Sequence, residues 1–376
     1  MIEAEWLRSP ASQAVMSMLT DAGFEAWFVG GCVRNALLGE PVSDLDISTS
    51  ARPEQVMELA ESAGLKAVPT GIEHGTITVI SDGQPFEVTT FRRDVETDGR
   101  RAVVAFADTL EEDAQRRDFT MNALYADATG AVTDPVGGLP DLEARHFRFI
   151  GDAEARIRED YLRILRFFRF FAWYGTELDA EGLSACAALA DGIETLSSER
   201  VTSEMMKLLS APDPLRAVGA MEQTGVLTRA LPGATGRMLG PFMLLDFSET
   251  DDPIARLAAL GGDAETLRLS KAEARALETY RTACDAPMSA AEFGYRLGHE
   301  TGLKALALSA ATLERPLTPE EVEAVATGAD AVFPVKAADL PSALQGAEIG
   351  AALKRLEAAW IAEGFAPTKA ELLAKL

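Results

Sequence analysis

Histidine and cysteine are scarce in this sequence, with three residues of each among 376. The histidines form no H-E-x-x-H pattern and no adjacent His–Asp pair, so hydrolysis at a histidine-bound metal is not expected. The cysteines are odd in number and widely spaced, which argues against a zinc site and suits a reducing compartment. They lie at Cys32, Cys186 and Cys284.

Long hydrophobic runs are also missing, although 47% of the residues are hydrophobic. No run is long enough to span a bilayer. The N-terminal stretch MIEAEWLRSP is acidic and lacks the basic and apolar regions of a signal peptide. We therefore expect a cytoplasmic protein with no membrane partner.

Positive charge is in deficit, because 35 Lys and Arg stand against 59 Asp and Glu for a net charge of −24. Such a chain is not a general nucleic-acid binder. Screening limits electrostatic reach to about 8 Å at physiological salt, so a local basic groove can still work on an acidic body. Arginines cluster at Arg92, Arg93, Arg100, Arg101, Arg116, Arg117, Arg156, Arg158, Arg163, Arg166 and Arg169. They are either such a groove or partners for the many carboxylates.

One dense segment stands out against these absences, FEAWFVGGCVRNALLGEPVSDLDISTS at residues 24–50. Residues 24–29 have the length and composition of a strand. Gly30 and Gly31 follow, and residues 32–38 have helical apolar spacing that Gly39 and Pro41 terminate. The order is strand, glycine corner, helix and second strand.

Two aspartates open the second strand of this segment. Asp44 and Asp46 are two apart, so in a strand they share one face and lie about 7 Å apart. Two carboxylates so placed repel each other unless a cation lies between them. Mg²⁺ prefers oxygen ligands and commonly takes one or two carboxylates plus substrate phosphates. A solvated turn is the alternative for an isolated D-x-D.

The glycine corner suits an anion. Without side chains, Gly30 and Gly31 let the backbone N–H groups at a helix start approach a phosphate. Arg34, one turn into the helix, is placed to add a forked donor. The segment therefore predicts a phosphate-binding corner beside a metal-binding pair of carboxylates.

GGCVRNALLGEPVSDLDIST resembles the signature of the nucleotidyltransferase superfamily, in the class of CCA-adding enzymes (tRNA nucleotidyltransferases) and bacterial poly(A) polymerases. The family usually has Asp where this chain has Asn35, which weakens any role for that position and leaves the aspartate pair untouched. The resemblance implies an α+β fold, in which an N-terminal mixed sheet with helices precedes an all-helical C-terminal half.

Two further strands are expected at 75–81 and 86–91, joined by a turn. Glu87 alternates away from Phe86 and Val88, so it can reach the aspartate face as a third carboxylate. An exposed strand Glu is equally compatible with the residues alone. The resemblance favours the third carboxylate.

Residues 92–106 are polar and glycine-marked and predict a mobile loop, with a plain hairpin as the alternative. The family carries a flexible loop here that helps the switch to adding A, so the resemblance favours full CCA addition. The following R-R-D-F-T-x-N-A motif matches at Arg116, Arg117, Asp118 and Asn122. Arg117 is the expected nucleotide contact, while Arg116 and Asp118 are alternatively a structural ion pair.

Residues 157–175 predict one helix that the resemblance identifies with base selection. Asp160 and Arg163 lie three apart, which in a helix places them on one face. A surface salt bridge is the plain alternative. In the family, an E-D-x-x-R motif lets the protein act as template, because carboxylate and guanidinium pair with a Watson–Crick edge. Arg166 and Arg169 match family arginines that hold the phosphates and the helix geometry.

The remaining chain predicts helices. Residues 1–23 favour one amphipathic helix, and 53–63 another. Glu199, Arg200, Glu204 and Lys207 match a family motif expected to form a buried charge network. We expect a catalytic head at 1–140, a neck at 141–209, and a helical body and tail at 210–376 where the resemblance places tRNA.

The expected function is Mg²⁺-dependent addition of C, C and A to the tRNA 3′ end from CTP and ATP, without a template. Poly(A) polymerase, a CC-only or A-only enzyme, and a non-catalytic RNA-binding protein are the alternatives. The expected site residues are Asp44, Asp46 and Glu87 for catalysis, with Asp44 and Asp46 as metal ligands, and Gly31, Arg34, Arg117, Asp160, Arg163, Arg166 and Arg169 for the nucleotide.

Overall fold

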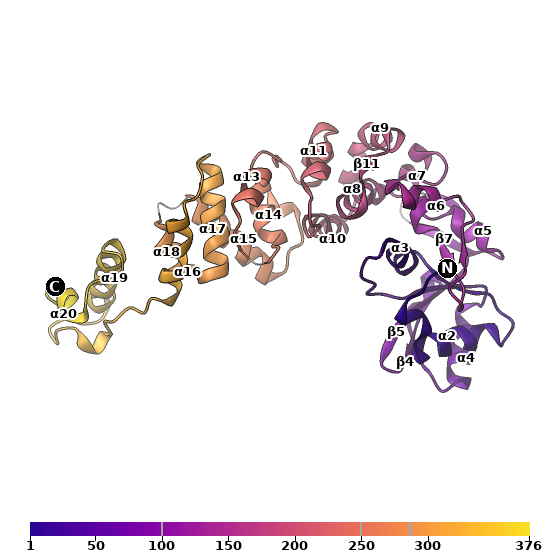
Figure 1. Ribbon diagram of the computed structural model, residues 1–376, viewed down its shortest axis with the longest axis horizontal. Helices are drawn as coiled ribbons and strands as arrows, with labels where there is room; N and C mark the ends of the chain where they lie inside the picture. The colour runs from indigo at the N-terminus through magenta and orange to yellow at the C-terminus, as the bar shows by residue number, and fades with distance from the viewer. Residues whose placement is uncertain (99–100, 249, 286–287) are drawn as a thin grey trace. The chain divides into compact units, whose positions relative to one another are not determined.

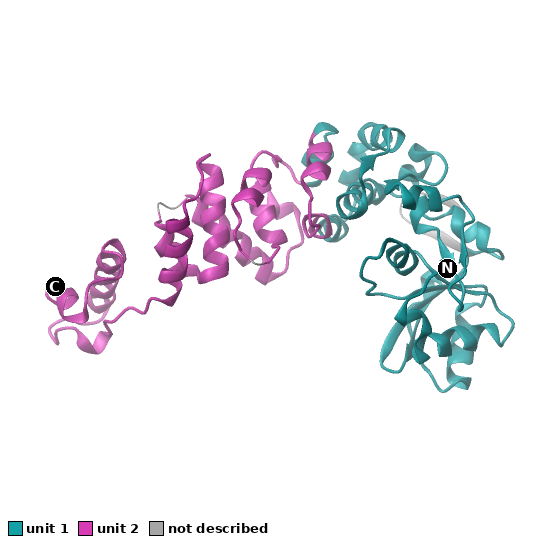
Figure 2. Cartoon of the chain, viewed as in Figure 1, with its two compact units in different colours: residues 1–204, 223–230 teal, residues 205–222, 231–376 magenta. Residues whose placement is uncertain are grey.

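The computed structural model describes residues 1–98, 101–248, 250–285 and 288–376. The chain folds into two compact units, coloured separately in Figure 2. Unit 1 contains residues 1–204 and 223–230, and unit 2 contains residues 205–222 and 231–376.

A seven-stranded mixed sheet forms the N-terminal part of unit 1, in the order β3-β4-β5-β2-β1-β8-β9 (Figure 1). Its strands are β1 Ala26–Val29, β2 Asp46–Thr49, β3 Lys66–Gly71, β4 Thr76–Ser81, β5 Gln84–Thr90, β8 Tyr125–Ala126 and β9 Val132–Thr133. Strands β2 and β5 run parallel, and the other neighbouring pairs run antiparallel. The strands expected at 24–29, 75–81 and 86–91 are confirmed, whereas the aspartate strand begins at Asp46, so Asp44 precedes it.

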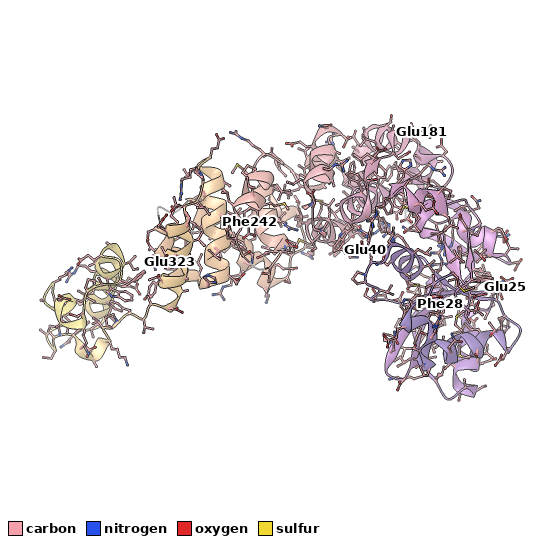
Figure 3. The ribbon with its side chains drawn as sticks, in the orientation of Figure 1. Glu25, Phe28, Glu40, Glu181, Phe242 and Glu323 are labelled. Atoms are coloured by element: carbon pink, nitrogen blue, oxygen red, sulfur yellow. The ribbon has the colours of Figure 1, made fainter. Side chains whose placement is uncertain are left out.

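One face of this sheet is apolar. Phe28, Ile47 and Val88 lie in register on β1, β2 and β5, and each is fully buried. Helices α2 (Pro10–Thr20) and α4 (Pro53–Ser62) pack on the sheet and contribute buried residues such as Val15 and Val56 (Figure 1; Phe28 is labelled in Figure 3). Since side chains alternate along a strand, the opposite face is left for polar residues.

The N-terminal segment forms two helices, α1 (Glu5–Arg8) and α2, so the expectation of a single helix over residues 1–23 is wrong. The break lies at Ser9, whose backbone is extended and whose hydroxyl accepts a hydrogen bond from the Ser12 N–H at 3.1 Å. Pro10 occupies the first turn of α2. Proline disfavours helical backbone in the residue before it, which explains the break.

Residues 92–106 form an antiparallel hairpin of β6 (Arg92–Asp98) and β7 (Arg101–Phe106). The expectation of a loop is therefore corrected to the hairpin alternative over these strands. Gly99 and Arg100 lie outside the described residues.

The rest of unit 1 is mainly helical. Its further elements are α3 Gly31–Leu38, η1 Ile72–His74, α5 Leu110–Gln115, η2 Thr120–Asn122, α6 Leu139–Glu143, β10 His146–Phe147, α7 Ala153–Glu159, α8 Leu162–Tyr174, β11 Glu177–Leu178, α9 Ala180–Ala188, η3 Ala190–Thr195 and α12 Val226–Ala230, with α10 Ser198–Leu209 crossing into unit 2. Phe119, Phe147, Phe149, Phe167 and Phe170 pack with ring centroids 4.8–6.3 Å apart. These rings join the head to α8.

Beyond residue 210 the described chain contains helices and no assigned strand, as expected. They are α11 Leu215–Gln223, α13 Leu239–Leu245, α14 Pro253–Leu260, η4 Ala264–Thr266, α15 Lys271–Asp285, α16 Ala290–Leu297, α17 His299–Thr312, α18 Pro319–Asp330, η5 Ala337–Asp339, α19 Ala347–Ala362 and α20 Lys369–Leu373. The α+β fold expected from the sequence is thus confirmed. Within the described ranges, no helix has both the length and the apolar character that crossing a membrane requires.

Candidate active site

The centre of the candidate site is the polar face of β2 and β5. Asp46 pairs directly with Glu87 across the parallel strands, so the two carboxylates lie on the same face. Ser48 and Thr89 follow on that face, and all four line a cavity of about 210 Å³. The sequence-based expectation that Glu87 shares the face of Asp46 is confirmed.

Burial and neighbouring carboxylates raise the proton affinity of Asp46. Burial raises the pKa of Asp46 to about 6, with further contributions from Glu87 and Asp44, while Arg117 opposes the shift. Negative charge is therefore concentrated where Asp46 lies, and a cation would relieve it.

The donor set suits a hard divalent cation that keeps other ligands. No three His, Cys, Asp or Glu side chains converge tightly enough to hold an ion by themselves anywhere in the part of the chain that the structure describes. Asp46 and the nearby Asp44 offer two carboxylates, and Mg²⁺ commonly binds through one or two carboxylates plus phosphates and water. The residues present therefore fit such an ion.

Asp44 lies in an extended segment before β2. Its side chain is exposed and accepts a hydrogen bond from the Ser43 hydroxyl at 3.0 Å. The next residue, Leu45, accepts the Glu87 N–H at 3.2 Å through its carbonyl. The pairing with β5 thus extends to Leu45, one residue before the start of β2, and fixes the backbone next to Asp44.

The glycine corner adjoins Asp46. Continuing the β1–β2 register places Val29 opposite Asp46, so α3 starts at the same edge of the sheet. Gly30, the residue before α3, has φ +69° and ψ −120°, a conformation available to glycine. The Cys32 thiol lies 3.9 Å from the Asp46 carbonyl oxygen. The first N–H groups of α3, beginning at Gly31, have no partners within the helix, which makes this end suited to an anion.

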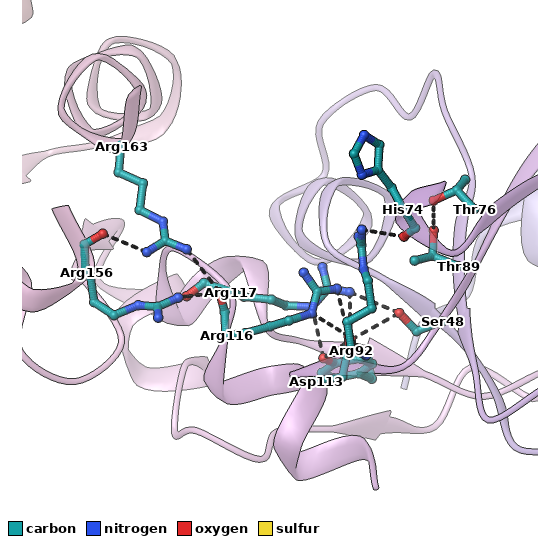
Figure 4. Close-up of polar contacts among 11 residues, drawn as sticks. Ser48, His74, Thr76, Thr89, Arg92, Asp113, Arg116, Arg117, Arg156 and Arg163 are labelled. Atoms are coloured by element: carbon teal, nitrogen blue, oxygen red, sulfur yellow. Dashed lines mark hydrogen bonds and ion pairs between the residues drawn. The ribbon is translucent and has the colours of Figure 1, made fainter. Parts of the chain in front are cut away.

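Arg117 lies between the corner and the carboxylates. A side chain at Gly30 would place its Cβ 3.5 Å from an Arg117 guanidinium nitrogen. The same guanidinium donates to Ser48 Oγ at 3.0 Å (Figure 4) and to Tyr125 Oη at 2.9 Å. Burial alone would lower the pKa of Arg117, but Tyr125 and Asp113 raise it above the ordinary value. Arg117 is therefore a fixed cation at the cavity wall.

Asp113 is the functional residue that sequence reasoning missed. It is fully buried and accepts hydrogen bonds from Arg116 at 2.7 and 2.9 Å, from Arg117 at 3.0 Å and from the backbone N–H of Arg92 at 3.2 Å. The Tyr125 and Ser48 hydroxyls also donate to it, at 2.9 and 3.2 Å. Burial favours its neutral form, yet Arg117 and Arg116 hold its pKa below the ordinary value. Asp113 lies three and four residues before these arginines on α5, a spacing that could have identified it.

Arg34 is buried within unit 1. Only 5% of it is exposed, and burial lowers its pKa. Its guanidinium donates to the side-chain oxygens of Asn35 and Asn122, and lies 4.5 Å from the ring centre of Tyr174 on α8. Arg34 therefore connects α3 to α8 in this structure.

The segment expected to select the base differs from the expected single helix. Helix α7 ends at Glu159 and α8 begins at Leu162, with Asp160 in extended backbone at φ −156° and ψ 105°. The argument that Asp160 and Arg163 share a helix face is therefore wrong. The Asp160 carboxylate accepts from the Leu162 N–H at 3.0 Å and from Arg200 at 2.7 Å.

Arg163 instead turns toward the chain around α5. Its guanidinium donates to the carbonyls of Arg156 and Arg116, at 2.7 and 3.3 Å (Figure 4). It also pairs with Glu159. Arg156 also donates to the carbonyl of Arg117, at 2.8 Å. The segment expected to select the base is thus connected to the backbone of the expected nucleotide arginine.

A second cavity of about 380 Å³ shares the Arg116 side chain with the carboxylate cavity. Its lining includes Arg156 and Glu159, near Arg163, and Arg116, which also lines the carboxylate cavity. Asp160 and Arg163 do not line the carboxylate cavity itself. The structure thus brings Asp46, Glu87 and Arg117 together at one cavity and leaves Asp160 and Arg163 outside its lining.

Arg166 and Arg169 lie in α8 and form ion pairs with carboxylates outside that helix. Arg166 donates to Asp118 at 2.7 Å, and Arg169 pairs with Glu204 of α10 at 2.5 Å. Both guanidinium groups lie over the Phe170 ring, at 5.1 and 4.0 Å. Glu204 is 4% exposed, as the expected buried network requires, but Glu199, Arg200 and Lys207 of the same motif are exposed, so the expectation of burial is wrong for these three.

The alternative of an Arg116–Asp118 ion pair is corrected by the same contacts. Arg116 pairs with Asp113, and Asp118 pairs with Arg166. Burial would raise the pKa of Asp118, but Arg166 and Asn122 hold it below the ordinary value.

Comparison with known proteins agrees with this geometry. A family model described as "Poly A polymerase head domain" matches residues 26–148, and one described as "Probable RNA and SrmB- binding site of polymerase A" matches residues 175–237. A CCA-adding enzyme of Geobacillus thermodenitrificans is 42% identical over 231 residues, which are 60% of this chain and 56% of that protein. One of Streptococcus pyogenes is 44% identical over 209 residues, which are 55% and 51% of the two chains.

A solved structure resembles nearly the whole chain. It is the CCA-adding enzyme of Bacillus stearothermophilus in complex with CTP, with a TM-score of 0.73, 30% identity and coverage of 94% of each chain. By sequence alone, the matched part spans little more than half the length of the curated relatives.

The glycine corner, the carboxylate strand and the adjoining helices define a nucleotidyltransferase head. The chain belongs to the family that contains the CCA-adding enzymes. Enzymes of this family generally use divalent metal ions.

Proposed function

We propose that this chain is a CCA-adding tRNA nucleotidyltransferase. It adds C, C and A to the tRNA 3′ end from CTP and ATP, without a template, and releases pyrophosphate at each step. The pairing of Asp46 with Glu87 beside the glycine corner and Arg117 is the observation that carries the proposal. The likeness to a relative solved with CTP supports a nucleotide as the ligand.

Asp44 and Asp46 hold Mg²⁺ in this proposal, and Glu87 is the third acidic residue of the site. When bound, the metal lowers the pKa of the attacking 3′-hydroxyl and offsets charge on the leaving pyrophosphate. Asp46 releases its proton to become a ligand, because burial and its neighbours hold its pKa near 6. Glu87 lies on the same face as Asp46 and adds a second carboxyl group near the cation.

The N–H groups at Gly31 and the guanidinium of Arg117 hold the triphosphate. Arg117 is a preorganised donor, because Tyr125, Ser48 and Asp113 fix its position before substrate arrives. Arg34, Arg166 and Arg169 support the nucleotide site from within unit 1, since their guanidinium groups contact Phe170.

Asp160 and Arg163 select the base. Each has an internal partner, Arg200 for Asp160 and Glu159 for Arg163, so reading a Watson–Crick edge requires them to exchange these partners for the base. The helical body at 210–376 receives the tRNA, and the protein works in the cytoplasm, where its free cysteines Cys32, Cys186 and Cys284 stay reduced.

The test is incubation of the full chain with tRNA lacking its CCA end, with CTP, ATP, UTP and GTP singly and together. We expect two C residues from CTP alone and a complete CCA end from CTP with ATP. Unlimited addition of A would indicate a poly(A) polymerase instead, and addition that stops after CC or begins only on CC ends would indicate a partial enzyme. The Asp44→Ala protein should be inactive, because it loses a metal ligand. Retained incorporation would rule out the proposed metal site.

Base selection is tested with the Asp160→Ala protein. It should incorporate U and G in addition to C and A, because the carboxylate that reads the base edge is gone. Its dependence on Mg²⁺ concentration should match that of the unchanged protein. Undiminished preference for CTP and ATP would exclude Asp160 from base selection.

A further inference from the structure

The Asn35 side chain joins helix α3 to the chain beyond its C-terminal end, because it contacts Arg34 in the helix and Pro41 after it. Its side-chain oxygen accepts two hydrogen bonds from Arg34, from Nε at 3.1 Å and from Nη2 at 2.8 Å. Its side-chain nitrogen donates to the carbonyl oxygen of Pro41 at 2.7 Å. Because the guanidinium has only donors, the amide orientation is fixed with oxygen toward Arg34 and nitrogen toward Pro41.

Pro41 is the first residue of the segment 41–45, which contains Asp44. Helix α3 ends with Gly39 in left-handed backbone at φ +74°, and the Glu40 N–H donates to the Asn35 carbonyl at 2.9 Å. Residues 40–45 then run without helix or strand to β2. At the far end of this segment, the Leu45 carbonyl is held by the Glu87 N–H at 3.2 Å.

Asp44 therefore stands between two anchored carbonyls. Only positions 42 and 43 separate it from Pro41, and Leu45 follows it directly. The Leu45 anchor belongs to the sheet, whereas the Pro41 anchor depends on one side-chain amide, that of Asn35. The position of the Asp44 carboxylate relative to Asp46 thus depends on Asn35.

We propose that Asn35 is a positioning residue that holds the segment 41–45 against α3 and thereby sets the affinity of the Asp44–Asp46 pair for its divalent cation. The inference rests on the proposed function in that it takes these two carboxylates as metal ligands. Asparagine suits this position because it accepts from Arg34 and donates to Pro41 at once. Aspartate would keep the contacts with Arg34, but it has no donor for the Pro41 carbonyl and places like partial charges together.

Two substitutions of Asn35 distinguish the effect of its hydrogen bond to Pro41 from the effect of an added negative charge. Asn35→Asp retains shape and the Arg34 contacts but loses the donor, and Asn35→Ala loses both. Added negative charge near the metal site would by itself strengthen cation binding. If the Pro41 contact matters, both variants should instead weaken it, by about three- to tenfold for one lost hydrogen bond.

The measurement is Mn²⁺ binding to the full chain, from the electron paramagnetic resonance signal of the free ion, at saturating non-hydrolysable CTP analogue. Half-saturating Mg²⁺ in the tRNA extension assay is measured alongside. Glu40→Gln is the control, because Glu40 lies in the same turn (labelled in Figure 3), pairs with Arg145 only at 3.9 Å and leaves the Asn35–Pro41 contact intact. It should change the Mn²⁺ dissociation constant less than twofold.

Three outcomes would overturn the inference: Mn²⁺ binding within twofold of the unchanged protein in both variants, tighter binding in Asn35→Asp, or no Mn²⁺ binding by the unchanged protein. Melting temperatures of all variants separate this role from a general loss of stability, and Asn35→Asp, which is isosteric, serves where Asn35→Ala is unstable. An unchanged protein that binds Mn²⁺ but extends no tRNA would refute the proposed function alone. An active protein with unaffected Asn35 variants would refute this inference alone.

Discussion

Asp46 is the residue where burial, charge and function meet. Its carboxyl is mostly buried, faces Glu87 across the parallel strands and has a pKa of about 6. In the metal-free protein the neutral form is favoured, so this group stabilises the fold at low pH and loses that contribution as pH rises from 3.8 to about 6. A cation bound at the site would instead favour the ionised form of Asp46, because the carboxylate is the form that binds it.

Metal binding should therefore compete with one proton. We expect the Mg²⁺ concentration for half-maximal tRNA extension to rise as pH falls below about 6, approaching tenfold for each pH unit. Assays at fixed ionic strength between pH 5.5 and 8 measure the midpoint. In Glu87→Gln the midpoint should move to lower pH, since a negative neighbour that raises the pKa of Asp46 is removed. A midpoint that stays in place in this variant would contradict the assigned origin of the shift.

Asp113 organises the arginines at the cavity wall. Replacing it by Asn leaves Arg116 and Arg117 without their shared buried counter-charge. We expect Asp113→Asn to lower the free energy of unfolding by about 3 kcal/mol and to raise the KM for CTP, because Arg117 loses its fixed position. Urea denaturation and steady-state kinetics measure the two effects.

Glu111→Gln is the matched control, because it removes the same charge from an exposed position of the same helix. Its effect on unfolding should stay within about 0.5 kcal/mol. Equal effects of the two substitutions would show that Asp113 acts only through net charge.

At the residue scale, alternation along a strand predicted the polar-face position of Asp46, but Asp44 precedes β2, so the argument that the two aspartates share a strand face is wrong. For Glu87 the residues alone left an exposed strand position equally open, and it is the pairing of β2 with β5 that places it opposite Asp46. Asp113 was missed because it lies among three acidic residues in the first turn of a helix, where negative charge is ordinary. Asp113 is the one of the three that is buried, where it accepts hydrogen bonds from Tyr125 of β8 and Ser48 of β2. The helix sequence alone does not show these contacts.

At the scale of elements, the break between α7 and α8 was the main failure of prediction. No proline or glycine interrupts residues 157–174. The extended backbone at Asp160 is held by its own side chain on the Leu162 N–H and by Arg200 from α10. A partner 40 positions away leaves no local signal in the sequence. Strands β1, β2, β4 and β5 were predicted from local composition and alternation, whereas β3, β8 and β9 were not expected and β6 and β7 were expected as a loop.

Helices α16 and α18 of unit 2 approach so closely that glycine is required at their contact. A Cβ at Gly328 would lie 1.8 Å from the Ala291 carbonyl oxygen, and one at Gly294 would lie 1.9 Å from that of Val325. Gly328→Ala should therefore force the helices apart and lower the free energy of unfolding by about 1–3 kcal/mol. Thermal unfolding measures the loss.

The control for this substitution is Gly350→Ala in α19, where a new Cβ meets open space. Alanine there should be neutral or stabilise by up to about 1 kcal/mol, because it favours helix. If Gly328→Ala behaved like Gly350→Ala, the close packing of α16 and α18 would be refuted.

At the scale of the whole molecule, all the residues expected at the active site belong to unit 1. Ligands that bind only the folded form of one unit stabilise that unit. We expect two calorimetric unfolding transitions, of which Mg²⁺ with a non-hydrolysable CTP analogue raises only one, by about 2.7 kcal/mol at one hundred times the dissociation constant. Movement of both transitions together would show that the units unfold as one.

The contacts of Arg163 have a consequence for accuracy. Without nucleotide, its guanidinium already has three oxygen partners, from Arg156, Arg116 and Glu159. In the proposed role of Arg163 in base selection, an incoming base would therefore recruit it only by exchange, and the net gain would be the difference between two sets of bonds rather than the sum of new ones. A mismatched base with fewer acceptors would not compensate Arg163 for the loss of these three partners. Such a base would then be rejected without a steric clash, because the hydrogen bonds that Arg163 makes in the free protein are the better alternative.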